Sequence, residues 1–273
     1  MNFVQYSPFQ VSTRLVAIAL VGVSLVSNTL LQAQTQKKPS GQDLTNNLSQ
    51  SHSQGAAPLM DSAKLAALPF YKSIEKALTE RDQVYRIDLE IQRLTEIPAN
   101  ISELYNLQEL YVNRNNLRGL PASIGNLKNL QVLYVRRNRM TKLPNTIGQL
   151  VNMRAFDVSD NELEDIPALI GNMVGLNVLY LSRNYLTYIP PSIGWLKNVR
   201  ELYLDNNQIE TLPPEIGKLT NLLILDLSGN NLTTLPIGIE KLVKLKELRL
   251  SGNLISEIEL TRIRGILPNV VIK

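Results

Sequence analysis

The stretch Leu107–Asn129 reads LQELYVNRNNLRGLPASIGNLKN, and the sequence repeats this pattern, with changes, every 23 residues. The units begin at Val84, Leu107, Leu130, Met153, Leu176, Val199, Leu222 and Leu245. Their shared form is L-x-x-L-x-L-x-x-N-x-L-x-x-L-P-x-x-I-G-x-L-x-N. A register kept over eight units predicts a solenoid in which each unit packs against its neighbours.

Each part of the unit has a structural role. The L-x-L portion alternates as a strand does, so stacked units form a parallel sheet with every second side chain facing outward. An asparagine follows, and its amide can satisfy backbone groups where the chain turns inward. This structural ladder comprises Asn115, Asn138, Asn161, Asn184, Asn207, Asn230 and Asn253, with Gln92 in the first unit. Proline then blocks a regular element, and the I-G-x-L segment predicts a short helical or turn-like back.

On this motif, residues 84–269 resemble the leucine-rich-repeat family. The LPxxIGxLxN form is similar to the Ras-group type, which occurs in intracellular signalling scaffolds and in many bacterial proteins. The resemblance implies an α/β fold, a right-handed solenoid or horseshoe with a concave parallel β-sheet and short helical or turn-like convex segments. The motif specifies the fold and leaves the partner open.

Four regions follow from the pattern along the chain. Residues 1–33 contain the apolar run Leu15–Val26, which is typical of a signal peptide and also compatible with an uncleaved membrane anchor. Residues 34–65 are rich in Gln, Ser, Asn and Gly and predict a flexible polar linker. Residues 66–83 predict an N-terminal helical cap, because Phe70–Arg81 has helical spacing. Residues 84–273 form the domain of eight repeats, including a C-terminal cap in which Glu259 stands where proline is expected.

The composition bears on the class of function. The chain has no cysteine, its single histidine is His52 in the polar stretch, and the net charge of +4 is too small to indicate nucleic acid. The phosphate-binding motif G-x-x-x-x-G-K-[ST] and the nucleophile motif G-x-S-x-G are absent. We therefore expect no catalytic residue, no metal site and no cofactor, and the sequence predicts that the protein is not an enzyme.

The N-terminal run predicts export, and therefore a secreted, periplasmic or cell-envelope location, with a cytoplasmic location as the alternative. Exported animal and plant members of the family commonly carry cysteine-bearing caps. The absence of cysteine beside an export signal therefore favours a bacterial protein. A membrane is expected to be contacted only through the N-terminal segment, if that segment is uncleaved.

The outward column of the sheet is the candidate ligand-binding surface. It comprises Asp88, Tyr111, Tyr134, Asp157, Tyr180, Tyr203, Asp226 and Arg249. Its tyrosines offer a rigid aromatic face and a hydroxyl, which suits recognition. Two residues earlier along the strands, an apolar strip is formed by Val132, Ala155, Val178 and Ile224. One flank is basic and consists of Arg114, Arg136, Arg137 and Arg183.

These features predict a non-enzymatic interaction module that binds a protein or peptide ligand on its concave face. The alternatives are a cytoplasmic Ras-group-like signalling scaffold, a glycan-binding surface protein and a passive structural protein. A second interpretation of the tyrosines is also open: lateral pairs in a sheet contribute about 0.2–1 kcal/mol each without any ligand. In the same way, Asp160 between Arg137 and Arg183 can serve only to neutralise the ladder.

Overall fold

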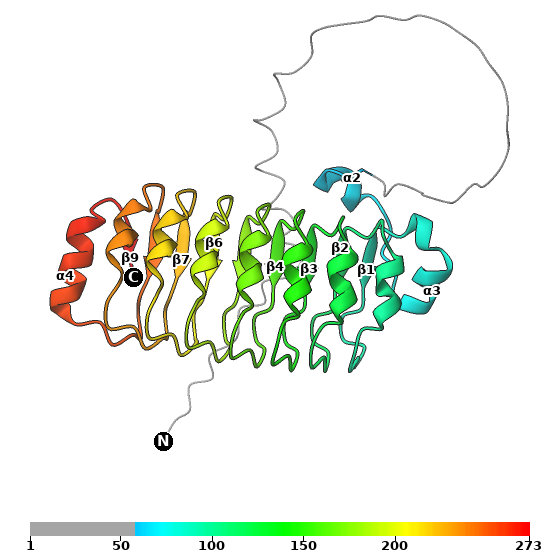
Figure 1. The fold of residues 1–273 in the computed structure, drawn as a ribbon, viewed down its shortest axis with the longest axis horizontal. Coiled ribbons are helices and arrows are strands. Elements are labelled where there is room, and N and C mark those ends of the chain that lie inside the picture. Colours follow the sequence, from blue (N-terminus) through cyan, green and yellow to red (C-terminus); the bar gives the residue numbers. More distant parts are fainter. Residues whose placement is uncertain (1–57) are drawn as a thin grey trace, which may run out of the picture. The chain divides into compact units, whose positions relative to one another are not determined.

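The computed structural model describes residues 58–273, so the expected signal peptide or anchor and most of the expected linker lie outside the described residues. Nine strands of the described chain form one parallel sheet in which spatial order equals sequence order (Figure 1). The strands are β1 (Arg86–Asp88), β2 (Glu109–Tyr111), β3 (Val132–Tyr134), β4 (Ala155–Asp157), β5 (Val178–Tyr180), β6 (Glu201–Tyr203), β7 (Ile224–Asp226), β8 (Glu247–Arg249) and β9 (Val271–Ile272). The predicted α/β solenoid with a parallel sheet is confirmed.

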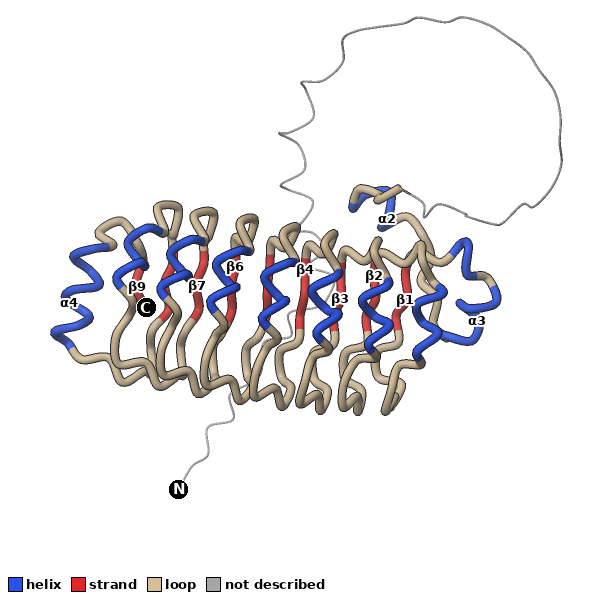
Figure 2. The backbone as a smooth tube through the Cα atoms, in the orientation of Figure 1, coloured by secondary structure: helices blue, strands red, loops and turns tan. Residues whose placement is uncertain are grey.

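Each of the first seven repeats returns through a short 3-10 helix on the side opposite the sheet (Figure 2). Each of these helices starts directly after a proline, whose fixed φ suits an extended entry to the turn. They are η2 (Ala99–Glu103), η3 (Ala122–Asn126), η4 (Asn145–Gln149), η5 (Ala168–Asn172), η6 (Pro191–Trp195), η7 (Pro214–Lys218) and η8 (Ile237–Lys241). The core lies between helices and sheet, where the central strand residues Leu110, Leu133 and Phe156 are fully buried.

The asparagine ladder joins each repeat to the preceding one. The amide Nδ2 of Asn161 donates to the carbonyl oxygens of Val158 at 3.0 Å and of Val135, one repeat earlier, at 3.1 Å. Its Oδ1 accepts from the Met140 N–H at 3.0 Å. The other six asparagines make the equivalent bonds. One buried amide therefore satisfies both its own turn and that of its neighbour.

On the helical side of the stack, a glycine in each of five repeats allows neighbouring repeats to pack closely. A Cβ atom on these glycines would lie between 2.0 and 2.5 Å from a backbone oxygen of the next repeat. The glycines are Gly125, Gly148, Gly171, Gly194 and Gly217. The 3-10 helices of neighbouring repeats can approach this closely only because no side chain separates them.

The N-terminal cap differs from the prediction of a helix over Phe70–Arg81. The helix α3 covers only Ile74–Thr79, followed by η1 (Arg81–Gln83). Tyr71 is extended and pairs with β1: its N–H donates to the Arg86 carbonyl, and its carbonyl accepts from the Asp88 N–H, both at 2.9 Å. The unpaired backbone groups at the edge of β1 outweigh the local helical pattern, because they need partners.

The expected linker over residues 34–65 contains a helix where the structure describes it. Helix α2 (Ser62–Ala66) is capped by Asp61, whose carboxylate accepts from the Lys64 N–H at 2.8 Å. Residues 60–67 belong to a unit separate from the repeat body. Across residues 58–273, every helix is too short or too polar to cross a bilayer.

The C-terminal cap consists of α4 (Glu257–Ile266) and β9. Glu259, which replaces the expected proline, joins α4 to the preceding repeat. Its Oε1 accepts from the Thr234 hydroxyl at 2.7 Å and from the Leu235 N–H at 3.1 Å, and Arg262 donates to it at 2.6 Å. The hydrogen bonds from Arg262 lower the pKa of Glu259 from 4.5 to about 2.

We predict that Gly148→Ala destabilises the protein by about 1–3 kcal/mol, because the new methyl group meets the Leu169 carbonyl oxygen at 2.1 Å. The control is Gly265→Ala in α4, where a Cβ atom would meet nothing within 4 Å. That change should stabilise by up to about 1 kcal/mol, since alanine favours a helix. Urea unfolding measures both, and an equal sign for the two variants would contradict the account.

We predict that Glu259→Gln lowers stability above pH 4.5, the ordinary pKa, and that the difference from the natural protein fades toward pH 2. The sign follows because the folded state lowers the pKa of Glu259, so its carboxylate stabilises only while ionised. Melting temperatures across this pH range are the measurement. The control is Glu257→Gln, which removes an exposed carboxylate from the first turn of the same helix, and an equal loss in the two variants would contradict the role of Glu259.

Candidate functional site

The first and third residues of β1–β8 point away from the core and form what we call the sheet face. The strands pair without a register shift, so that Tyr111 lies beside Tyr134 and Tyr180 beside Tyr203. The candidate column therefore forms one continuous lateral ladder, as its 23-residue spacing predicts. Its members differ strongly in their surroundings.

The N-terminal part of the sheet face is an interlocked aromatic cluster. The ring of Tyr111 makes edge contacts with Phe70 at 5.6 Å and with Tyr134 at 5.2 Å between centroids. The Arg86 guanidinium lies 3.8 Å from the centroid of Phe70 and donates to Glu109 at 2.8 Å. Only 5% of Tyr134 is exposed. This part of the face is thus packed and neutralised within the protein.

Phe70 is a member of this cluster that the repeat pattern did not reveal. Phe70–Lys72 lies beside Arg86–Asp88 at an offset of 16 residues, because Tyr71 pairs with Ile87. The period of the repeats is 23, so their pattern could not place Phe70 on the sheet face. Only the pairing of the cap with β1 brings it there.

Tyr180 and Tyr203 form a second, separate aromatic pair. Their rings are stacked, with centroids 4.8 Å apart and an interplanar angle of 11°. Both side chains remain partly exposed. The Tyr203 hydroxyl donates to Glu201 at 2.9 Å, whereas the Tyr180 hydroxyl has no hydrogen-bond partner among residues 58–273. Burial and the nearby Glu201 raise the pKa of both hydroxyls, so both stay protonated as donors.

Two aspartates of the candidate column differ in how they are held. Asp157 separates the two aromatic groups and accepts from the N–H and the hydroxyl of Ser159, at 2.9 and 2.5 Å. Burial raises the pKa of Asp157, partly offset by these bonds. Asp226 is 5% exposed and is paired with Arg249 at 2.8 Å. Asp226 is therefore committed to an internal ion pair.

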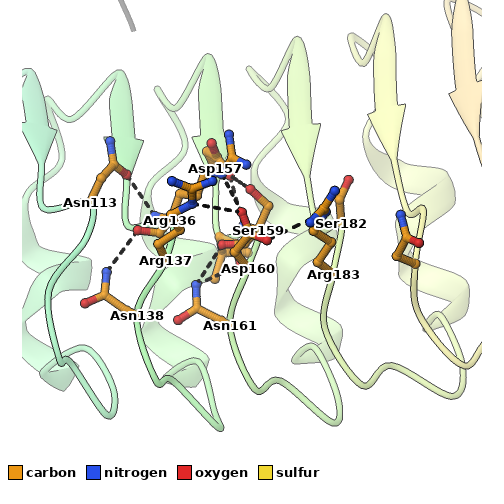
Figure 3. A network of polar contacts seen from close by, with 12 residues as sticks. Asn113, Arg136, Arg137, Asn138, Asp157, Ser159, Asp160, Asn161, Ser182 and Arg183 are labelled. Atoms are coloured by element: carbon orange, nitrogen blue, oxygen red, sulfur yellow. Dashed lines mark hydrogen bonds and ion pairs between the residues drawn. The ribbon is translucent and has the colours of Figure 1, made fainter. Parts of the chain in front are cut away.

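Three of the four candidate arginines meet at one carboxylate (Figure 3). Asp160 Oδ2 lies 2.7 Å from Arg136 Nε and 3.6 Å from Arg137 Nε, and its Oδ1 lies 3.7 Å from Arg183 Nε. Arg114 is in the neighbouring turn, where its N–H donates to the Arg136 carbonyl at 2.9 Å. We call these four side chains, with Asp160, the arginine cluster.

The turn that carries the arginine cluster has a left-handed backbone. Residues of this column have φ between 53° and 64° in consecutive repeats, and they are Arg114, Arg137, Asp160, Arg183, Asn206 and Gly229. Such a turn ordinarily favours glycine, asparagine or aspartate. The glycines of the last two repeats, Gly229 and Gly252, were the sequence signal for it. The exposed arginine side chains follow from this turn geometry.

Within the described residues, no group of three or more His, Cys, Asp or Glu side chains is placed to hold a metal ion. In the fourth repeat, Asp160 is paired with arginines and Asp157 accepts from Ser159. What the sheet face offers a ligand is therefore aromatic surface, hydroxyl donors and guanidinium groups.

Leucine-rich-repeat family models match residues 82–140, 106–163 and 197–255, and a model of two such repeats matches 174–217. The chain belongs to the leucine-rich-repeat family. A comparison with curated proteins found no match. The family assignment thus rests on the repeats themselves, together with the fold.

Solved leucine-rich-repeat structures include similar ones from plants and bacteria. One is the ectodomain of the Arabidopsis thaliana receptor kinase GASSHO1/SCHENGEN3 in complex with CASPARIAN STRIP INTEGRITY FACTOR 2, with 31% identity and a TM-score of 0.56 over 63% of this chain. This leucine-rich-repeat chain spans only 24% of that ectodomain. The plant peptide hormone receptor RGFR1 in complex with RGF2 has 28% identity and a TM-score of 0.54, over 68% of this chain and 34% of the receptor.

An internalin from Listeria monocytogenes shares the fold, with 19% identity, a TM-score of 0.57 and coverage of 74% of this chain and 66% of its own. The family and the two plant receptors support a protein-interaction module.

Proposed function

We propose that this leucine-rich-repeat protein is exported, is not an enzyme, and binds an extended protein or peptide segment on its sheet face. The observation that carries the proposal is the stacked pair of Tyr180 and Tyr203. The pair is partly exposed, and the Tyr180 hydroxyl has no hydrogen-bond partner in the described part of the chain. Stacked rings give a ligand a rigid aromatic surface at a low entropic cost.

The surroundings of the pair favour the middle of the sheet face as the contact region. Toward the N-terminus, Arg86 and Glu109 pair with each other and are only 11% exposed. Toward the C-terminus, Arg249 is held by Asp226 and Glu247 at 2.8 and 2.5 Å. These charged side chains at both ends of the face are therefore already paired within the protein. The middle retains partly exposed aromatic rings and a hydroxyl that a ligand can contact.

The similar plant receptors lend support of a second kind, because each was solved with a partner bound, one with CASPARIAN STRIP INTEGRITY FACTOR 2 and one with RGF2. The present chain covers a minor part of each receptor. That this chain binds the same class of ligand, a protein or peptide, is therefore part of the proposal.

A phage-displayed library of random twelve-residue peptides, selected on the immobilised full chain, tests the proposal. We expect enriched sequences, and we expect Tyr180→Ala with Tyr203→Ala to weaken binding of the selected peptides about tenfold or more. The matched control is Tyr185→Ala with Tyr188→Ala. These two tyrosines lie in the same repeat region but off the strands, and are 52% and 50% exposed.

Equal losses in the two double variants, or no enrichment at all, would contradict a peptide-binding face. Tyr180→Phe with Tyr203→Phe keeps the stacked rings and shows whether the hydroxyls matter. A glycan array serves as a comparison: signals that vanish only in the Tyr180 and Tyr203 variants would favour a glycan ligand instead.

Export is proposed on the apolar run Leu15–Val26. We predict that the full chain, expressed in a bacterium, is found outside the cytoplasm and that Leu20→Arg retains it inside, because a charge interrupts the apolar run. Fractionation with N-terminal sequencing is the measurement. A soluble cytoplasmic product that retains Met1 would overturn export and favour the intracellular scaffold.

A further inference from the structure

We infer that the segment bound on the sheet face is acidic, and that its carboxylates contact the arginine cluster. The inference rests on the proposed function, since it names the chemistry of the same ligand. Its basis is the charge, the exposure and the backbone setting of Arg114, Arg136, Arg137 and Arg183.

The arginine cluster carries more positive charge than the single carboxylate at its centre can neutralise. Arg136, Arg137 and Arg183 share the single carboxylate of Asp160, within 3.7 Å of its oxygens. Arg114 lies in the adjoining turn, bonded through its backbone to Arg136. Two other carboxyl groups are near: Asp157 is bonded to Ser159, and Asp205 accepts from the Ser182 hydroxyl and the Asn206 amide. The three guanidinium groups around Asp160 therefore exceed the charge of the carboxylate they share by two.

The guanidinium groups are exposed, whereas the shared carboxylate is not. The side chains of Arg136, Arg137 and Arg183 are 41%, 44% and 64% exposed, against 18% for Asp160. In each pair the arginine uses Nε, and a guanidinium has five N–H donors in all. The remaining donors are available for the planar, two-point contact that arginine makes with carboxylates.

The fold itself does not require arginine in this turn. Gly229 and Gly252 form the same left-handed turn in later repeats, and Asn206 forms it in the sixth. For a residue with a Cβ atom, this conformation costs about 1–2 kcal/mol. Arginine recurs at a position where smaller residues complete the turn more readily, which favours a role for its side chain.

The spacing of the repeats also suits an extended peptide. Neighbouring strands lie about 4.8 Å apart, so Arg137 and Arg183, two repeats apart, are separated by roughly 10 Å along the row. In an extended segment, alternate side chains lie about 7 Å apart on one side, within reach of two long arginines. Arg183 also follows Tyr180 by three residues, which places aromatic surface beside the cluster.

Two pools of fluorescein-labelled nonapeptides test the inference on the full chain. Both pools are random except for two central positions that have one residue between them. These two positions are aspartate in one pool and asparagine in the other. We expect the aspartate pool to bind about tenfold more strongly, and the difference to shrink as salt is raised. Equal binding of the pools, or binding of neither, would overturn the inference.

Matched variants separate the arginine cluster from the overall charge. Arg137→Asn with Arg183→Asn should weaken the aspartate pool about fivefold and leave the asparagine pool unchanged. Asparagine is the natural residue of this turn at Asn206, so folding should be retained. The control is Arg154→Asn with Arg200→Asn, two exposed arginines that precede β4 and β6, in a column that carries asparagine at Asn177.

Equal losses in both double variants would reduce the effect to net charge and overturn the inference. Asp160→Asn should instead strengthen binding of the aspartate pool about twofold, because it removes the competing carboxylate. A single-stranded oligonucleotide that binds more tightly than the aspartate pool would also overturn it. If the natural protein shows no preference for the aspartate pool, while the Tyr180 and Tyr203 variants lose binding of both pools, the inference is wrong and the proposed function is retained.

Discussion

Hydrogen-bonded parallel strands lie about 4.8 Å apart, and the structure of this protein depends on every part of each repeat meeting that spacing. On the sheet side the strands do so by themselves. On the helical side, neighbouring repeats reach this spacing only because a glycine allows the backbone of the next repeat to approach. A Cβ atom at that position would lie 2.0–2.5 Å from a backbone oxygen. Between the two sides, an asparagine amide such as that of Asn161 ties each turn to the one before.

The same lateral spacing determines what the sheet face can become. Side chains at equivalent positions must lie side by side, so that aromatic residues either interlock or stack with their neighbours. Tyr111 interlocks with Phe70 and Tyr134 in the N-terminal part, while Tyr180 and Tyr203 stack alone beyond Asp157. The ladder is therefore divided into two parts that differ in packing and exposure. Sheet stabilisation fits the first group, and the second retains exposed surface.

Charge follows the same division. The ends of the sheet face are closed by internal pairs, Arg86 with Glu109 and Arg249 with Asp226. In the middle, three arginines converge on Asp160, and their side chains remain exposed. A ligand that bound the middle of the face would meet aromatic surface and positive charge together, whereas at the ends it would have to displace existing partners.

The periodic part of this protein was determined by sequence alone, because an interaction repeated at a constant interval leaves a constant interval in the chain. The strands, the asparagine ladder and the lateral column of Asp88 to Arg249 all follow from a period of 23 residues. The tertiary structure decided what breaks that period. Tyr71 and Phe70 join the sheet at an offset of 16 residues, and Glu259 replaces proline to hold the last helix. Tertiary packing also decided which tyrosines are buried and which arginines share a carboxylate, since those outcomes depend on neighbours in three dimensions rather than on spacing along the chain.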